Sequence, residues 1–317
     1  MKWKFYSLAF VAGMSILTAC SSDDNNDNDG NGGNGNGNEI ENGTILKGTI
    51  TSDVTLAAGN TYKLSGEYIV EEGGTLHIEE GVKIIAVYDD IADYILVKQG
   101  GKINAVGTPD KPIVMTSEKE EPGAWGGIHI CGRAHTNAEG GKGSSEIGGA
   151  VYGGNDDADN SGTLQYIRLE YTGFAFDEEH EANGISFYSV GNGTIVDHCQ
   201  AYKGSDDGFE FFGGSVNVSN LVAVSCSDDS FDWTEGWNGK GTNLVAYQEA
   251  ESTLGYDCDC LMECDNNGSN NAATPVAHPV LKNLILVGNG GSKQGIRLRA
   301  GTEVEIDNAK VCGKGQP

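Results

Sequence analysis

Short runs of alternating hydrophobic and polar residues follow one another along this chain, separated by Gly, Asn and Asp. Alternation with a period of two is typical of β-strands with one buried face, and no stretch shows a convincing helical period of 3.6 residues. The pattern also repeats: SDDGFEFFGG at residues 205–214 recurs as SDDSFDWTEG at residues 227–236, 22 residues later. Weaker copies follow, DCLMEC at 259–264 and GIRLR at 295–299.

Two architectures contain many short strands at such spacing, the β-sandwich and the β-solenoid. A sandwich does not explain why neighbouring segments share sequence, whereas stacked solenoid coils must present matching side chains to one another. Glycine suits corners that need positive φ. We therefore predict an all-β fold, a right-handed single-stranded parallel β-helix over residues 44–317. Its coils should contain about 22 residues or more, with an insert at about 135–162.

The start of the chain predicts a targeting signal rather than a folded element. Two lysines precede a short apolar run, and Leu17-Thr18-Ala19-Cys20 follows. This motif resembles the lipobox of bacterial lipoproteins, so residues 1–19 are expected to be a signal peptide and Cys20 the lipidated residue. Residues 20–43 are rich in Asp, Asn and Gly and are expected to form a disordered tether. Acidic residues just after the cysteine resemble a surface-export signal, which implies lipid-anchored display on the outer membrane.

Charge excludes a nucleic-acid partner, and hydropathy excludes a membrane-spanning helix. The chain has 20 Lys and Arg against 46 Asp and Glu, a formal charge of −26. Nucleic acid would be repelled by such a surface. No apolar run reaches the ~20 residues that a membrane-spanning helix needs, so no transmembrane span is expected.

Several segments resemble bacterial surface β-helix proteins of the pectin-lyase-like superfamily. They are GGTLHIEEG at residues 73–81, GKINAVGTPDKPI at 101–113 and WGGI at 125–128. The likeness is strongest to Bacteroidota lipoproteins and covers about residues 44–317. It implies the fold, but it identifies no reaction.

Strand parity predicts which side chains face outward. Residues such as Phe209 and Phe211 should face the core, and the residue between them should face solvent. Stacking the repeats then gives one exterior column of Ser186, Glu210, Asp232, Glu263 and Arg297. Four residues earlier in each coil lies a second acidic column of Asp206, Asp228 and Asp259, with Lys293 below it.

These columns bring acids within about 5 Å of one another, which disfavours ionisation of all of them together. Ca²⁺ would relieve the repulsion, and Asp206, Asp228 and Asp259 are the candidate ligands. Pectin-lyase-like polysaccharide lyases resemble this arrangement, with Ca²⁺ on stacked acids and a nearby basic residue. The catalytic candidates in such an enzyme, or in a glycosidase, are Glu210, Asp232, Glu263 and Arg297.

Candidate ligand-binding residues lie beside the acids. Arg297 and Arg299 could clamp a substrate carboxylate, and Phe212 has outward parity suited to stacking on a sugar. The leading hypothesis is a surface lipoprotein that binds polysaccharide or another extracellular ligand, with calcium and without catalysis. A calcium-dependent lyase or glycosidase is one alternative and a structural spacer the other. In the purely structural interpretation, Asp206 and Asp207 form turns and Glu210 and Asp232 belong to a solvated face.

Two further groups were candidates for chemistry. In the insert, Asp157 and Asp159 belong to a run of oxygen-bearing side chains that could bind Ca²⁺, although the spacing is not that of an EF-hand. Cys258, Cys260 and Cys264 share the parity of the core, which favours buried free thiols over disulfides or zinc.

Overall fold

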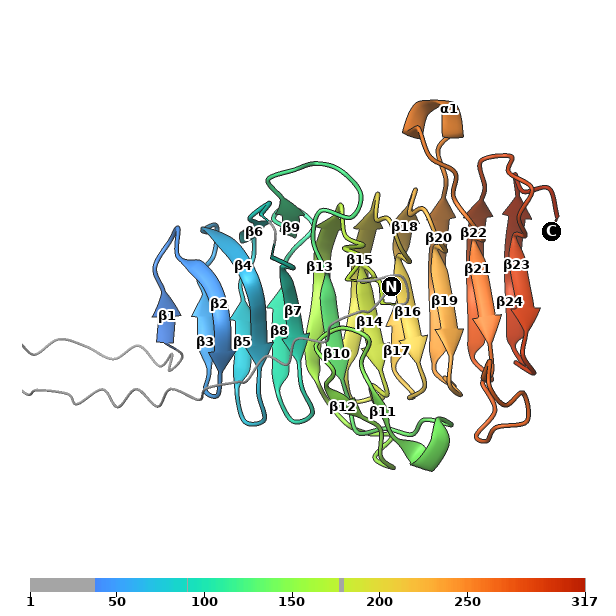
Figure 1. Cartoon of the computed structure of the whole chain (residues 1–317), viewed down its shortest axis with the longest axis horizontal. Coiled ribbons are helices and arrows are strands. Elements are labelled where there is room, and N and C mark those ends of the chain that lie inside the picture. The colour runs from blue at the N-terminus through green and yellow to red at the C-terminus, as the bar shows by residue number, and fades with distance from the viewer. Residues whose placement is uncertain (1–37, 90, 177–179, 317) are drawn as a thin grey trace, which may run out of the picture. The chain divides into compact units, whose positions relative to one another are not determined.

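The computed structural model describes residues 38–89, 91–176 and 180–316, and they form a right-handed parallel β-helix, as predicted. Strands run across the solenoid in three rows, and each strand pairs in parallel with its counterpart in the next coil (Figure 1). Coil length varies: 22 residues separate Asp207 from Asp229, 31 separate Asp229 from Cys260, and 34 separate Glu263 from Arg297. The predicted signal peptide, Cys20 and most of the tether lie outside the described residues.

One row of strands carries the candidate site and is called the site face here. Its members are β2 (Ile45–Ile50), β4 (Thr61–Val70), β7 (Tyr94–Val97), β10 (Ile128–Cys131), β14 (Ile185–Tyr188), β16 (Phe209–Phe212), β19 (Phe231–Thr234), β21 (Met262–Asp265) and β23 (Ile296–Arg299).

The other two rows share several long strands that bend at a corner. They contain β1 (Asn38–Ile40), β3 (Val54–Leu56), β5 (Thr75–Ile78), β6 (Lys83–Ala86), β8 (Lys102–Val106), β9 (Ile113–Ser117), β13 (Gly162–Glu170), β15 (Ile195–Tyr202), β17 (Asn217–Ser219), β18 (Val222–Val224), β20 (Lys240–Tyr247), β22 (Val280–Val287) and β24 (Glu305–Cys312). The corner residues of the last coils are Asn220, Asn243, Asn283 and Asn308, all at positive φ, with each side chain hydrogen-bonded to the next.

The interior is a continuous apolar stack. Phe209 lies over Phe231 with ring centroids 5.6 Å apart, and Phe187 lies over Phe211 at 5.0 Å. All four side chains are buried, and for Phe209, Phe211 and Phe231 of the two repeats strand parity predicted this burial. The predicted cysteines Cys258, Cys260 and Cys264 are buried and free, so they pack as small apolar side chains.

A second apolar cluster lies outside the solenoid, between the site face and the insert. The insert contains η1 (Glu139–Gly141) and the antiparallel pair β11 (Gly143–Ser144) and β12 (Val151–Tyr152), drawn at the lower edge of Figure 1. Its Ile147 and Tyr152 join outward side chains of the site face, including Leu96, Tyr188 and Phe212. The insert therefore covers part of a face that parity alone assigns to solvent.

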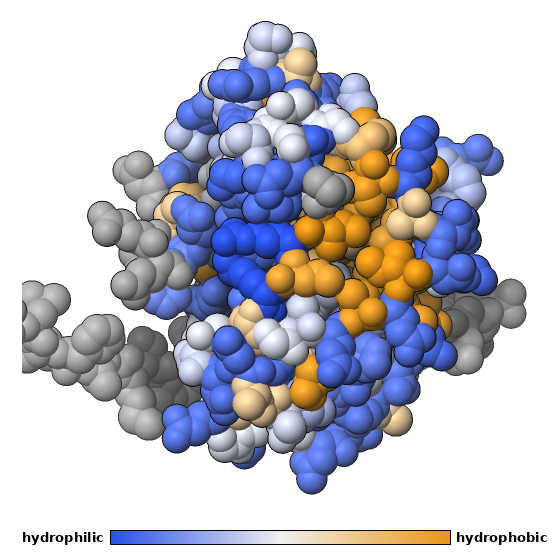
Figure 2. Space-filling model, turned by 90° about the vertical axis from the view of Figure 1, so that its right-hand side faces the viewer, coloured by the Kyte–Doolittle hydropathy of each residue, from blue (hydrophilic) through white to orange (hydrophobic). Residues whose placement is uncertain are grey.

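The last coil leaves apolar side chains open. Leu298 is 52% exposed and Val304 and Val311 are only partly buried, because among the described residues β23 and β24 each pair with a strand on one side only, β21 and β22. Figure 2, a view onto this end of the solenoid, shows hydrophobic residues gathered on the face with hydrophilic residues around them. The short helix α1 (Glu251–Leu254) projects from the opposite edge to the insert (Figure 1). Among the described residues, no helix has the length and hydropathy to cross a membrane.

Candidate functional site

The exterior column has the register that the repeats predicted. Ser186 pairs with Glu210, Glu210 with Asp232, Asp232 with Glu263, and Glu263 with Arg297. A slip of one residue at the third copy would have turned Glu263 into the core. The structure thus places three acids on successive strands of the site face, one strand spacing apart.

Two of these acids, Glu210 and Asp232, meet carboxyl groups from other segments of the chain around one hollow of about 210 Å³. All seven lining residues of the hollow carry carboxyl groups: Glu146, Glu181, Asp206, Asp207, Glu210, Asp228 and Asp232. Within it, one carboxylate oxygen each from Asp207, Glu210 and Asp232 lies within 4.8 Å of the others. We call this hollow the acidic pocket.

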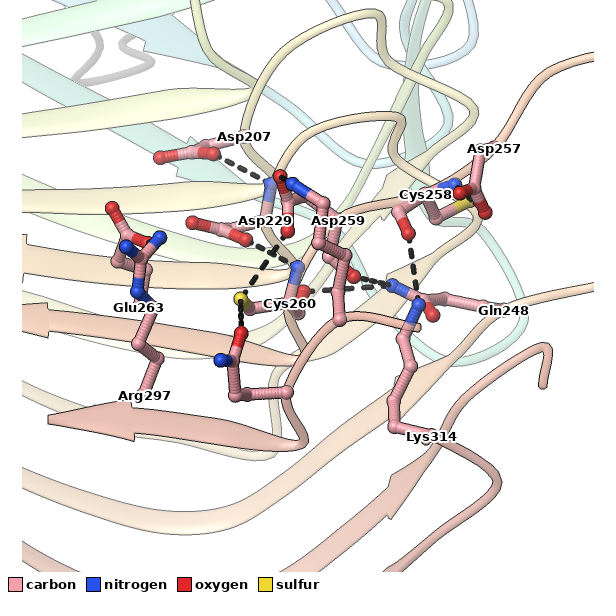
Figure 3. Close-up of polar contacts among 12 residues, drawn as sticks. Asp207, Asp229, Gln248, Asp257, Cys258, Asp259, Cys260, Glu263, Arg297 and Lys314 are labelled. Atoms are coloured by element: carbon pink, nitrogen blue, oxygen red, sulfur yellow. Dashed lines mark hydrogen bonds and ion pairs between the residues drawn. The ribbon is translucent and has the colours of Figure 1, made fainter. Parts of the chain in front are cut away.

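Asp207 and Asp229 form a ladder between coils beside the acidic pocket (Figure 3). The Asp207 carboxylate accepts a hydrogen bond from the backbone N–H of Asp229 at 2.8 Å, and Asp229 accepts one from Cys260 at 2.6 Å. Both aspartates are buried. The Asp207 carboxylate therefore bonds to the backbone of the next coil, 22 residues away, and not to its own turn, and this bond holds the pocket wall in place.

Burial and crowding raise the pKa of the carboxyl groups in this region. Loss of hydration is the largest cause throughout, and neighbouring carboxylates add to it. The pKa rises to about 7 for Glu146 and Asp206 and to about 9 for Asp229. For Glu210 and Asp232 the pKa lies well above the ordinary value. In addition, Oδ1 of Asp232 is buried and has no hydrogen-bond partner among the described atoms.

Lysine and arginine side chains of the described residues pair with acids at the C-terminal end of the two columns. Arg297 binds Glu263 at 2.6 Å (Figure 3), and Arg299 binds both Glu263 and Asp265. Lys293 forms an ion pair with Asp259. Both arginines are therefore held by protein carboxylates, which leaves the predicted clamp for a substrate carboxylate without direct structural support.

The family model of the pectate-lyase-like beta helix domain matches residues 48–317. The chain belongs to this family. The match covers the site face, the insert and both acidic columns, so the acidic pocket is a feature of a pectate-lyase-like β-helix. The search of curated proteins gave no match.

Other predicted site residues have different surroundings from those expected. Phe212 faces outward but is only 7% exposed, since it stacks on Tyr188 at 4.4 Å beneath the insert. Its ring is therefore not available for stacking on a sugar. Asp157 binds His135 at 2.6 Å, and Asp159 accepts from the backbone of Arg133 at 3.2 Å.

Asp157 and Asp159 therefore organise the insert, and the structure does not bring them together as a metal site. Neither belongs to the groups of acids and thiols whose ligand atoms converge within the described chain. Short polar loops use Asp in this way, to satisfy backbone N–H groups.

Sequence reasoning missed two kinds of pocket residue. Asp207 was assigned only to a turn, although the doubled aspartate of the SDD repeat was a usable signal that two columns of acids stack there. The sequence gives no such signal for Glu146 and Glu181. Both lie outside the repeat, and only the folded path of the chain brings them to the pocket.

Proposed function

We propose that this pectate-lyase-like β-helix binds Ca²⁺ in the acidic pocket and holds a polysaccharide on the site face, as a lipid-anchored protein of the cell surface. The observation that carries the proposal is the pocket itself, seven carboxyl side chains in about 210 Å³ with no Lys or Arg in its lining. Loss of hydration disfavours the charged form of the five acids that come from the repeats, Asp206, Asp207, Glu210, Asp228 and Asp232, and a bound divalent cation would compensate that cost.

The ligand chemistry suits calcium. Ca²⁺ takes six to eight oxygen ligands in flexible geometry, and carboxylates supply them. Asp207, Glu210 and Asp232 would form the centre of the site, with Asp206 and Asp228 beside them, because their oxygens already converge. The predicted ligand Asp259 would lie outside it, since Lys293 neutralises its carboxylate.

The family and the shape of the molecule support a glycan as the bound polymer. A β-helix presents a long, rigid face on which an extended chain can contact several coils. An exposed calcium ion would keep coordination positions for sugar hydroxyl or carboxylate oxygens. The motif at Cys20 and the acidic tether support display at the outer surface of the cell.

Affinity electrophoresis of the whole chain tests this function. Gels would contain polygalacturonate, alginate or xylan, with either 5 mM Ca²⁺ or EDTA. We expect at least one polymer to retard the protein with calcium only, and we expect Glu210→Gln with Asp232→Asn to abolish that retardation. Asp110→Asn, an exposed aspartate far along the chain from the pocket, is the matched control. Equal migration of all proteins with calcium and with EDTA would refute the proposal.

A glycosidase is the second candidate, because of the geometry of the same acids. Asp207, Glu210 and Asp232 have carboxylate oxygens within 4.8 Å, comparable to the ~5–5.5 Å of retaining glycosidases. A retaining mechanism needs one protonated acid and one ionised carboxylate, and burial raises the pKa of Glu210 in the direction that the general acid requires. Release of new reducing ends, lost in Glu210→Gln with an unchanged circular dichroism spectrum, would establish this reaction. Intact polymers after prolonged incubation would leave binding as the function.

A further inference from the structure

A larger hollow of about 630 Å³ lies at the other end of β19. It opens between the insert and the loop that joins β21 to β22, both at the lower edge of Figure 1. The residues around it are polar or small: Asn137, Ala138, Glu139, Thr234, Glu235, Asn267, Gly268, Ser269 and Asn270. Thr234 follows Asp232 by two residues on the same strand, so both side chains point from the same face.

The walls of this hollow are held together by buried amides. Asn137, which is 8% exposed, donates from Nδ2 to Asn266 Oδ1 at 2.8 Å and to the carbonyl of Pro275 at 3.0 Å. Its Oδ1 accepts from Asn267 at 3.0 Å. These bonds link the insert to the β21–β22 loop across more than a hundred residues of sequence, 129 from Asn137 to Asn266. The hollow is consequently formed before any ligand arrives.

Glu235 has the most constrained position in the lining. Its φ is +54°, a left-handed conformation that is uncommon for a residue with a Cβ and that concentrates at functional sites. Thr136 and Tyr152 donate to the same carboxylate oxygen, Oε2, at 2.8 and 2.9 Å. The insert thus fixes the orientation of the carboxylate, while Oε1 accepts no hydrogen bond from the described residues.

Other lining groups also have unused hydrogen-bonding capacity. In the described part of the chain, the side chains of Glu139, Thr234 and Ser269 and the Nδ2 of Asn270 form no hydrogen bond or ion pair. The lining therefore offers carboxylate acceptors, one amide donor and two hydroxyl groups that can donate and accept hydrogen bonds. A ligand rich in hydroxyl groups, each a donor and an acceptor, matches it, whereas two carboxylates disfavour an anionic ligand.

We propose that this hollow binds one neutral sugar unit, with Oε1 of Glu235 accepting from the sugar hydroxyls and Asn270 donating to them. The inference rests on the proposed function in taking the bound polymer to be a glycan, but it does not depend on calcium. A glycan bound here would pass the end of β19, two residues from Asp232 on the strand that lines the acidic pocket.

Saturation-transfer NMR and calorimetry with methyl glycosides of glucose, galactose, mannose and xylose test the proposal. The whole chain is measured in EDTA, so that no calcium ion is bound to the protein. We expect at least one neutral glycoside to bind with millimolar affinity and the methyl glycoside of galacturonic acid to bind more weakly. Glu235→Gln, which keeps an acceptor for Thr136 and Tyr152, should weaken binding at least tenfold.

A second variant and a control distinguish loss of sugar binding from loss of the fold. Asn270→Ala changes an exposed loop residue and should weaken binding about threefold or more, whereas Glu251→Gln on α1 should change nothing. Absence of binding by every neutral glycoside, or equal affinity of both variants and the parent chain, would overturn the inference. Sugar binding in EDTA, together with no binding of calcium, would support this inference and refute the calcium site. Calcium binding, together with no sugar binding in EDTA, would support the calcium site and refute this inference.

Discussion

Asp232→Asn should have opposite effects on stability with and without calcium. Asp232 lies one strand spacing, about 4.8 Å, from Glu210 on the neighbouring coil. Two unit charges at about 5 Å in an effective dielectric of about 20 repel by about 3 kcal/mol. Glu263, on the other side, is already neutralised by Arg297 and Arg299. Removing one charge should therefore raise the free energy of unfolding at pH 8 in EDTA by about 1–3 kcal/mol.

The pH dependence follows from the direction of the pKa shifts. Burial raises the pKa of both Asp232 and Glu210, so the folded protein binds protons more tightly than the unfolded chain. The stability that these groups confer is complete at low pH and is lost as pH rises through the raised pKa values. The advantage of Asp232→Asn should accordingly be large at pH 8 and vanish near pH 4.

Calcium should reverse the order of the two proteins. A ligand present at about 1,000 times its dissociation constant stabilises the parent chain by about 4.1 kcal/mol, which exceeds the advantage of the variant in EDTA, and the variant, lacking a central ligand, should lose most of this gain. Differential scanning fluorimetry at pH 8 in EDTA and in 10 mM Ca²⁺ measures both effects, with Asp110→Asn as the control. A lower melting temperature of Asp232→Asn in EDTA, together with an equal calcium increment in both proteins, would refute the reasoning.

Two other changes separate electrostatic from structural contributions. Asp93 is buried, one of its oxygens has no partner among the described atoms, and burial raises its pKa to about 7. Asp93→Asn should therefore raise the unfolding free energy at pH 8, by up to about 4 kcal/mol, and leave it unchanged near pH 4, as followed by thermal unfolding at both pH values. Asn243→Ala removes two rungs of the corner ladder, to Asn220 and Asn283, and puts alanine at φ +57°. It should cost about 1–2 kcal/mol in chemical denaturation, and Asn243→Gly should cost less, because glycine accepts that φ without strain.

Most of the fold could be predicted from the repeats in the sequence. Two copies of the SDD motif, 22 residues apart on successive coils, place Glu210 beside Asp232, because stacked coils must match residue for residue. The third copy is 31 residues away and shares little sequence, yet its parity alone predicted the register of Glu263 correctly. Alternation is sufficient there, since one side of the strand faces a packed interior and a slip would bury the acid.

The same parity could not distinguish an outward position in water from an outward position under another segment. Phe212 and Glu210 lie on the same strand of the site face, but the insert covers Phe212 and leaves Glu210 in the lining of the acidic pocket. The insert has no repeat to fix its path, and its contacts join residues far apart in the sequence. Glu146, which lines the acidic pocket, and Tyr152, which orients Glu235, both belong to it. The solenoid thus supplies regular columns of acids, whereas the irregular insert adds side chains to the walls of both hollows, and its placement had to come from the structure.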